Sequence, residues 1–345
     1  MRHRNSIFPG LAFAISAILT TPTLAGDNLS TGSTRGRLTL TCLEIPDYGR
    51  GAGLAVVIQT PGGKTFLYDS GSGYPTKDGK GWEGNYNAGR DAILPFLRAK
   101  GITSIDGVLI SHGHFDHFGG LLWLVDHATI PKLIDSGYSF RGGHSSELAA
   151  YENLRNRFKK VPGAYVEAHT GDMVQLDPAL KVEVLFPPHE YFQGNPLRTH
   201  KKDTPEHYLP NANSLGIRIT HGDVVFLLPG DVQVTEQVEV LLPRIAPEKL
   251  RCNILVAPAH GIDAAPEFAQ ATHPEVTIAS ASGRYATWSA TPKVYGGLGS
   301  RVFVTGTHGR VSVISDGKSY TLDVEREPAK PLFREDSEFK TSARQ

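Results

Sequence analysis

The sequence predicts one layered α/β domain, with β-sheets on the inside and helices on the outside. Two observations support this prediction: strand-like and helix-like segments come in two similar rounds, and no linker separates the rounds. The chain has 345 residues, enough to bury a core without disulfides or structural metals. Lys and Arg number 35, as do Asp and Glu, so no overall positive charge would attract nucleic acid or an anionic membrane.

The segment 1–25 has the composition of a signal peptide. Positive charge in residues 1–5 precedes an apolar stretch that is too short to span a bilayer, and small residues follow up to Ala25. We expect cleavage after Ala25 and export to the periplasm or the medium. An uncleaved anchor is the alternative, because Thr23 stands where Ala is more usual. No later segment approaches the ~18 apolar residues of a spanning helix, so no membrane span is expected in the mature chain.

The first round of elements begins at residue 37, after the expected signal peptide. Apolar runs bounded by turn residues predict strands, and apolar residues at helical spacing predict helices. In chain order we expect strands at 37–45, 53–60 and 64–70, a helix at 89–101, a strand at 107–111, helices at 118–128 and 144–160, and strands at 164–168, 173–176 and 181–186.

The second round follows residues 187–213, which show no periodicity and contain several prolines. A loop of this length in a domain tends to be functional. Thereafter we expect strands at 214–222 and 224–231, a helix at 233–242, a strand at 253–260, a helix at 265–271, a strand at 276–280, a helix at 290–298, and strands at 301–307, 310–316 and 319–324. The domain is expected to span residues 37–325, and the charged residues 326–345 read as a flexible tail.

The chain has two cysteines, Cys42 and Cys252, and both fall in or beside expected strands. We interpret them as small buried apolar residues, with a disulfide as the alternative in an oxidising compartment. Neither lies near another candidate ligand in the sequence, so thiolate binding of a metal is not expected.

Residues 111–120, SHGHFDHFGG, place three histidines and one aspartate directly after a buried strand. Imidazole and carboxylate groups bind zinc, and the spacing of His112 and His114 allows both rings to reach one ion from a tight turn. We expect Gly113 to be there because a side chain would crowd the two rings. Asp116 and His117 can then face a second ion, ~3.5–4 Å from the first. The alternative is a chance cluster of surface or core histidines.

The segment SHGHFDH resembles the HxHxDH motif of the metallo-β-lactamase superfamily. Further stretches occur in the order expected of the branch that contains the extracellular domains of ComEC-type DNA-uptake proteins and their free-standing relatives. These stretches are AVVIQTPGGKTFLYDSG, GDMVQLDPALKVEVLFPP, NANSLGIRITHGDVVFLLPGDV and ILVAPAHG. The resemblance covers about residues 37–322 and implies an αββα sandwich, in which helices flank two mixed β-sheets.

The resemblance also implies a set of metal ligands. His112 and His114 would bind the first ion, and Asp116 and His117 the second. Asp231 matches the carboxylate that bridges both ions, and His260 matches the last ligand of the second ion. Because both of these residues follow apolar strands, we expect them at the same sheet edge as the histidine turn.

Two of the expected roles have an alternative. Asp231 precedes a helical stretch and could instead be its N-cap. Asp69, in LYDSG, resembles an aspartate of the family that orients a ligand histidine, but it could equally be an ordinary turn residue.

The chain departs from the family in the ligands of the first ion. Many members supply a third histidine just before the strand at 214–222, where this chain has Asn211 and Asn213, with His207 upstream. Asn is a weak zinc ligand, so the first position could favour a harder ion such as manganese. His207 could complete it by folding inward; a plain loop residue is the alternative.

Two further family histidines are absent from the segments APAHG and GRYATWSA. A substrate contact or proton donor could therefore be missing. His308 could replace one of these histidines, although a solvent-facing turn residue is the simpler interpretation.

The resemblance implies a hydrolase that binds one or two zinc ions, or manganese, and uses a metal-bound hydroxide aligned by Asp116. A phosphodiester, such as nucleic acid, is the expected substrate because of the DNA-uptake branch. Lys201, Lys202 and the basic run 152–160 could contact phosphates; for the run, a solvated helix face is the alternative. A carbonyl substrate (a β-lactam, lactone or thioester) and a non-catalytic DNA-binding or surface-binding role are the other two hypotheses. The sequence predicts no oligomeric state.

Overall fold

A computed structural model describes residues 36–47, 53–139, 146–193 and 205–327; for residues 205–207 it describes the backbone alone. The predicted signal peptide with its cleavage site at Ala25, the two lysines Lys201 and Lys202, and all but the first two residues of the expected tail lie outside these ranges.

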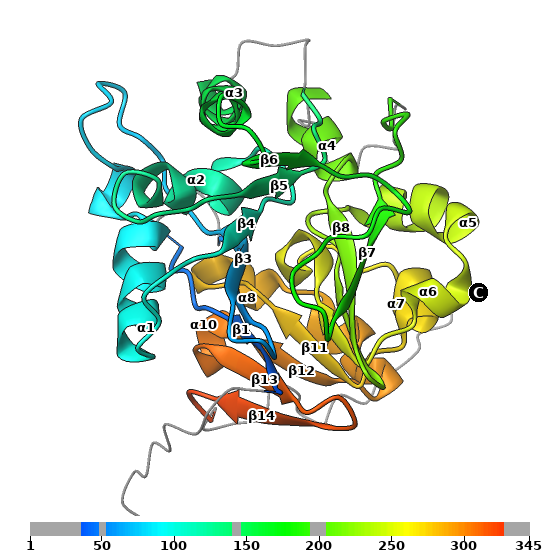
Figure 1. Ribbon diagram of the computed structural model, residues 1–345. Coiled ribbons are helices and arrows are strands. Elements are labelled where there is room, and N and C mark those ends of the chain that lie inside the picture. Colours follow the sequence, from blue (N-terminus) through cyan, green and yellow to red (C-terminus); the bar gives the residue numbers. More distant parts are fainter. Residues whose placement is uncertain (1–35, 48–52, 140–145, 194–204, 328–345) are drawn as a thin grey trace, which may run out of the picture. The chain divides into compact units, whose positions relative to one another are not determined.

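The first of two β-sheets has eight strands in the order β14-β13-β1-β2-β3-β4-β5-β6 (Figure 1). Its strands are β1 Leu38–Cys42, β2 Ala55–Gln59, β3 Thr65–Ser70, β4 Gly107–Leu109, β5 Leu133–Asp135, β6 Tyr165–Glu167, β13 Val311–Ser315 and β14 Tyr320–Val324. Neighbouring strands are antiparallel from β14 to β3 and parallel from β3 to β6. The sheet is therefore mixed.

The second sheet has six strands in the order β12-β11-β10-β9-β8-β7. Its strands are β7 Lys181–Phe186, β8 Gly216–His221, β9 Val224–Leu228, β10 Ile254–Val256, β11 Val276–Ala279 and β12 Arg301–Val304. Strands β7 to β9 are antiparallel, and β9 to β12 are parallel. The two rounds of elements thus follow one plan: antiparallel strands first, parallel strands afterwards.

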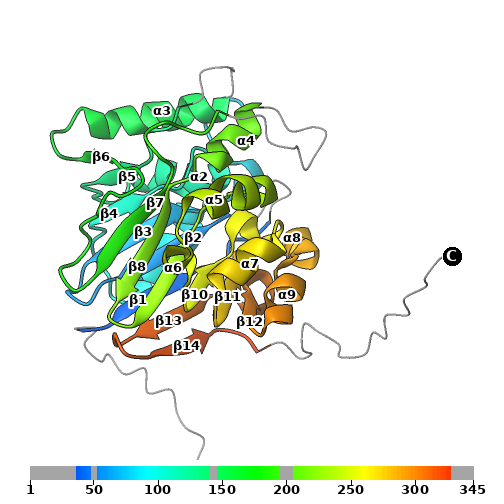
Figure 2. The same cartoon turned by 90° about the vertical axis from the view of Figure 1, so that its right-hand side faces the viewer.

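The two sheets pack against each other, and helices cover their outer faces (Figures 1 and 2). Side chains of both sheets form the largest apolar cluster, including Leu40, Val56, Ile217 and Phe226. A second cluster joins the first sheet to α1 Leu94–Ala99, α2 Phe115–Leu124 and α3 Ser146–Lys159. A third joins the second sheet to η3 Glu236–Leu241, α6 Pro247–Leu250 and α7 Pro266–Thr272. The expected αββα sandwich is confirmed.

Strands that are buried on both faces explain the continuous apolar runs of the sequence. All six residues of β3 are buried, as are the three residues of β4 and of β10.

The remaining helices are short and complete the outer layers. They are η1 Glu83–Asn85, η2 Gly89–Ile93, α4 Pro205–Ala212, α5 Leu242–Arg244, η4 Pro258–Gly261, α8 Gly283–Trp288, α9 Thr291–Val294, η5 Gly296–Leu298 and α10 Thr305–His308. Among the described residues, no helix is both long and apolar enough to cross a membrane.

Three expectations about the elements are wrong. The strand expected at 173–176 is reduced to an isolated bridge between Met173 and Glu183. The stretch 187–213 is not loop throughout, because α4 begins at Pro205, a residue that the first turn of a helix tolerates. The strand expected at 301–307 ends at Val304, and α10 takes up the next residues. In all three places tertiary packing decides the conformation of a short segment whose own sequence pattern is weak.

Cys42 and Cys252 are both buried and carry free thiols. Cys42 points into the core between the sheets, and Cys252 packs beneath the helices of the second sheet. The interpretation as small buried apolar residues holds, and the alternative disulfide is absent.

In the basic run 152–160, Arg157, Lys159 and Lys160 are exposed, as on a solvated helix face, but Arg155 is not. Arg155 of α3 is only 1 % exposed, and its Nε lies 2.7 Å from Asp135 at the end of β5. The hydroxyl of Tyr151 donates to the same carboxylate. Arg155 therefore holds α3 against the first sheet, because a buried cation is stable only when a carboxylate accompanies it.

Candidate metal centre

The six predicted ligands meet where two sheets end together. His112, His114, Asp116 and His117 follow β4 of the first sheet, in a turn and the first turn of α2. Asp231 follows β9 and His260 follows β10, and both of these strands belong to the second sheet. The expectation of a single sheet edge is therefore wrong. The carboxyl ends of parallel strands from both sheets converge on one place.

Two adjacent glycines bring α2 close enough to β3 for this convergence. A Cβ atom on Gly120 would lie 2.0 Å from the carbonyl oxygen of Ser70, and one on Gly119 would lie 2.2 Å from the amide nitrogen of Gly73. Any larger residue would push α2 away from the end of β3. The glycines of HFGG thus place His117 beside Asp69.

Four side chains form the more complete part of the centre, which we call the His260 position: Asp116, His117, Asp231 and His260. The Nε2 of His260 lies 3.4 Å from an oxygen of Asp116 and 3.4 Å from an oxygen of Asp231. The Nε2 of His117 lies 3.2 Å from the same oxygen of Asp231 and 3.9 Å from Asp116. All four are largely buried, so little water competes for these atoms.

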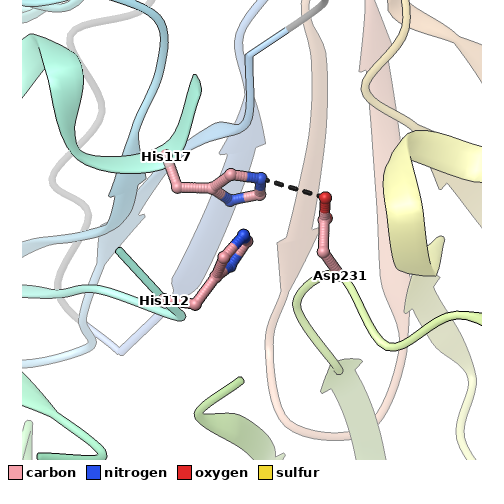
Figure 3. A group of neighbouring side chains, drawn as sticks. All are labelled: His112, His117 and Asp231. Atoms are coloured by element: carbon pink, nitrogen blue, oxygen red, sulfur yellow. Dashed lines mark ion pairs between the residues drawn. The ribbon is translucent and has the colours of Figure 1, made fainter. Parts of the chain in front are cut away.

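The second part, which we call the His112 position, consists of His112, His114 and Asp231. The Nε2 of His112 lies 2.9 Å from the Nδ1 of His114, so the two rings share a hydrogen bond. Donor atoms of His112, His117 and Asp231 lie within 4.8 Å of one another (Figure 3). Asp231 therefore stands between the two positions.

Asp69 orients histidines of both positions. Its Oδ2 accepts a hydrogen bond from Nδ1 of His117 at 2.8 Å, and its two oxygens accept from the amide and the hydroxyl of Ser111 at 2.7 Å each. The oxygen of that hydroxyl lies 3.0 Å from Nδ1 of His112. With Nδ1 of each ring held in this way, Nε2 faces the centre and offers a lone pair whenever the ring is neutral.

A backbone carbonyl fixes the ring of His260 in the same way. Nδ1 of His260 lies 3.0 Å from the carbonyl oxygen of Ser280, which can only accept a hydrogen bond. Nδ1 must therefore carry the proton, and Nε2 is left with its lone pair. The backbone that aims this ring is strained, because Ala259 and His260 have φ angles of 47° and 55°. Such left-handed conformations of residues other than glycine tend to occur at functional sites.

The electrostatics of the His260 position favour a positive charge. Burial lowers the pKa of His117, but the carboxylates of Asp231 and Asp69 outweigh burial and raise the pKa well above its ordinary value. Burial raises the pKa of Asp231, whereas His117 and His260 lower it, and the net pKa lies below the usual range. The carboxylates are thus charged at neutral pH, and an imidazolium compensates them.

His112 behaves in the opposite way. Burial, followed by the neighbouring His117 and His114, holds the pKa of His112 well below its ordinary value. The ring is neutral at neutral pH, which is the form that binds a metal.

The donor atoms of the His260 position fit a divalent cation. Nε2 of His117, Nε2 of His260 and Oδ1 of Asp231 are buried without a hydrogen bond in the described part of the chain. A cation with tetrahedral N and O ligands at about 2.0–2.1 Å keeps neighbouring ligand atoms about 3.3 Å apart. Three of the four separations above, at 3.2, 3.4 and 3.4 Å, are close to that value. Buried nitrogen and oxygen atoms at this spacing are what a cation would require.

The profile of the metallo-beta-lactamase superfamily matches residues 48–271, about two thirds of the chain. The chain belongs to the metallo-β-lactamase superfamily. It is 24% identical to ComE operon protein 3 of Bacillus subtilis (strain 168) over 242 residues, which cover 69% of this chain and 28% of that protein. This similarity supports the ComEC-type branch. The chain thus matches little more than a quarter of that relative's length.

Two weaker similarities carry less information. A segment of 71 residues is 39% identical to the uncharacterized protein YcaI of Escherichia coli (strain K12) and covers 21% of this chain and 8% of that protein. Igni18, a metallo hydrolase from Ignicoccus hospitalis, has a TM-score of 0.42 and 14% identity, with coverage of 79% of this chain and 98% of Igni18. A similarity of that size adds nothing to the functional argument.

Asn213 does not replace the third histidine that many members of the superfamily carry. The side-chain oxygen of Asn213 accepts a hydrogen bond from the amide of Phe192, and its side-chain nitrogen donates to the carbonyls of Phe192 and Leu209. Every polar atom of this amide is therefore used to hold the chain together. Asn211 is different, because its side-chain oxygen is buried and makes no hydrogen bond within the described residues.

Other candidates for the missing histidines can be placed only in part. The backbone of His207 belongs to α4, and its side chain lies outside the described atoms. His308 is 5 % exposed, and its Nδ1 contacts the backbone of Val304. The interpretation of His308 as a solvent-facing residue is wrong. The alternative role of Asp231 as a helix N-cap is wrong as well, because the next helical residue is Val234.

The structure gives a further reason for glycine at position 113. A Cβ atom there would lie 2.8 Å from the ring of Tyr151 on α3. The glycine therefore also leaves room for α3, which packs on the histidine turn.

Three serines support this superfamily site and were not predicted. Ser111 joins Asp69 to two histidines, the carbonyl of Ser280 holds His260, and the hydroxyl of Ser214 accepts from the amide of Asp231. Ser111 directly precedes His112, which is a usable sequence signal. Nothing local marks Ser214 or Ser280, since their roles arise from packing between distant segments.

Proposed function

We propose that this chain is an exported, metal-dependent hydrolase that cleaves phosphodiesters. Its hydrolase domain would extend over residues 37–325, and the segment 1–25 would be its signal peptide. One or two zinc ions would bind at the centre, with manganese as the other candidate.

The proposal rests mainly on the donor atoms of the His260 position. Two imidazole nitrogens and two carboxylates from both halves of the chain stand about one ligand–ligand distance apart. Nε2 of His117, Nε2 of His260 and Oδ1 of Asp231 are buried without a hydrogen bond in the described part of the chain. A structural ion pair would close such gaps with hydrogen bonds, because unpaired buried polar atoms are unfavourable. We assign Asp116, His117, Asp231 and His260 to one cation, and His112, His114 and Asp231 to a weaker second one.

The protein's own groups would prepare the reaction. A divalent cation, when bound, lowers the pKa of a water ligand and polarises the substrate oxygen. Asp116 is the least buried of the carboxylates, with 21% of its side chain exposed, so it can also accept a proton from an attacking water. Asp69 and Ser280 keep the rings of His117 and His260 from turning, which preserves the position of the reacting groups.

The choice of a phosphodiester has weaker support. It follows from the DNA-uptake branch that the sequence resembles and from the basic residues Lys201 and Lys202 in the segment 187–213. Export has the support of the charged, apolar and small-residue pattern of the segment 1–25. A nucleic acid or a small diester would be the substrate.

Purified protein beginning at residue 26 provides the test. We expect elemental analysis to find at least about one zinc or manganese ion per chain, and bis(4-nitrophenyl) phosphate to be hydrolysed. Hydrolysis of a chromogenic β-lactam, measured in parallel, tests the hypothesis of a carbonyl substrate. If only the β-lactam were hydrolysed, the substrate would be a carbonyl compound and the phosphodiester hypothesis would be wrong. Metal-loaded protein that hydrolyses neither compound would refute the proposal.

A non-catalytic role in binding DNA or a surface partner has one observation in its favour. Asn213 is fully engaged by Phe192 and Leu209, so it does not complete the His112 position. Metal content far below one ion per chain, with salt-sensitive DNA binding and no turnover, would select this role.

A further inference from the structure

The short helix α8, Gly283–Trp288, is fastened to the loop of His260 at both of its ends. Before α8, the carbonyl of Ser280 accepts the hydrogen bond from His260. After α8, the hydroxyl of Ser289 donates to the carbonyl of Gly261 at 3.0 Å, and the amide of Ala290 donates to the same oxygen at 2.9 Å. The position of α8 relative to the candidate metal centre is therefore fixed.

Three side chains of α8 form a layered group, which we call the α8 platform: Arg284, Tyr285 and Trp288. The Tyr285 and Trp288 rings meet edge to face, with centroids 5.6 Å apart. The guanidinium of Arg284 lies 5.1 Å from the centre of the Tyr285 ring and 5.5 Å from that of Trp288. These contacts hold the indole in place, since cation–π and edge-to-face contacts are directional.

The platform has a buried base and an exposed top. Tyr285 packs on the small apolar cluster of Ala257, Ala279, Ala281 and Val304. Trp288 is 59% exposed, which makes it the most exposed large apolar side chain in the described part of the chain. An indole costs free energy when it faces water. The other strongly exposed apolar side chains there, on Val161, Met173 and Leu298, are aliphatic.

Trp288 is also near the candidate metal centre. It directly precedes Ser289, which contacts Gly261, the neighbour of His260. With steps of about 3.8 Å between consecutive Cα atoms, Trp288 lies within about 15 Å of His260. A nucleotide that flanks a phosphate at the centre can reach that far.

We propose that the α8 platform binds an unpaired base of a single-stranded nucleic acid beside the phosphate to be cleaved. The proposal rests on the proposed function and narrows its substrate class. A base would stack on the exposed indole, and Arg284, which also pairs with Asp47 at 3.7 Å, would add positive charge next to the strand. Base pairs of a duplex are stacked on one another, so they would not use the platform.

Binding of a labelled single-stranded oligonucleotide with phosphorothioate linkages to the metal-loaded protein tests this proposal. We expect Trp288→Ala to weaken binding roughly 5- to 150-fold, the loss that removal of one base–aromatic stack produces. Trp288→Phe keeps a ring and should lose less. Leu298→Ala, an exposed apolar residue outside the platform, should bind as the unaltered protein does. Separate DNA and RNA strands distinguish the two sources of the base.

A duplex of the same sequence serves as the substrate control, and its binding should not depend on residue 288. Equal binding of single strands by Trp288→Ala and the unaltered protein would overturn the proposal, even if the phosphodiester chromogen is hydrolysed. If Trp288→Ala instead reduces sedimentation with anionic vesicles, or changes the mass of the protein in solution, without any effect on oligonucleotides, the indole contacts a membrane or a second copy. Hydrolysis of the chromogen by the unaltered protein tests the proposed function separately.

Discussion

The two metal positions share Asp231 but differ in how completely the chain surrounds them. The His260 position draws ligands from both sheets, and their donor atoms stand 3.2–3.9 Å apart without hydrogen bonds among them. In the His112 position two imidazoles satisfy each other at 2.9 Å, and Asn213 is turned to other partners. A site that needs a cation leaves its donors unpaired, whereas a site that can do without one lets them pair. We therefore expect the His260 position to bind first and more tightly.

The largest effect should come from the residue that both positions share. Asp231→Asn removes one negative charge between them, so we expect metal content to fall to background and phosphodiester turnover to fall on the order of 10³-fold, or about 4 kcal/mol. Elemental analysis and the chromogenic assay measure both. Asp223→Asn, an exposed residue of the β8–β9 turn, is the control. Full metal content in Asp231→Asn would show that the centre does not depend on this carboxylate.

The order of affinities can be tested with one variant for each position. His260→Ala should weaken the tightest metal by about 100-fold or more, because it leaves two buried carboxylates short of a partner. His114→Ala should retain one tightly bound ion, since the His260 position is intact. Titration against a fluorescent chelator gives the affinities. Retention of the tight ion in His260→Ala and its loss in His114→Ala would reverse the comparison.

Asp69 orients histidines of both positions, so Asp69→Asn should weaken both by about 10- to 100-fold. Asn is the suitable replacement because it tolerates the φ of 57° at this residue. Thermal unfolding followed by circular dichroism distinguishes a loss of orientation from a loss of folding. If only the tighter affinity changed, the hydrogen bonds through Ser111 would have no influence on His112.

A smaller effect concerns pH. The raised pKa of His117 means that the metal-free ring carries a proton at neutral pH, which a cation must displace. Affinity at the His260 position should rise with pH by up to about tenfold per unit until the raised pKa is passed. At the His112 position the pKa of His112 is lowered, so a cation has no proton to displace from this ring at neutral pH. Calorimetry in two buffers of different ionisation enthalpy counts the released protons. An affinity that does not change with pH would contradict the assigned charge of His117.

Local patterns were sufficient for much of the fold and for four of the six candidate ligands. Buried strands read as apolar runs, and the alternation of strands and helices predicted a layered α/β domain that the structure confirms. His112, His114, Asp116 and His117 are close neighbours in the sequence, so one turn and the start of α2 bring them together. Asp231 and His260 came from the resemblance to a family, because spacing along the chain does not determine which strand ends meet.

By itself, the sequence determined the alternation of elements and the histidine turn. Only the tertiary structure decided that the ligands come from two sheets, that Asn213 holds Phe192, that Gly113 makes room for Tyr151, and that Arg155 is buried against Asp135. The physical reason is the separation of the interacting residues along the chain. A turn or a periodic run depends on neighbouring residues, whereas a hydrogen bond or a steric limit between distant segments exists only after the sheets have packed.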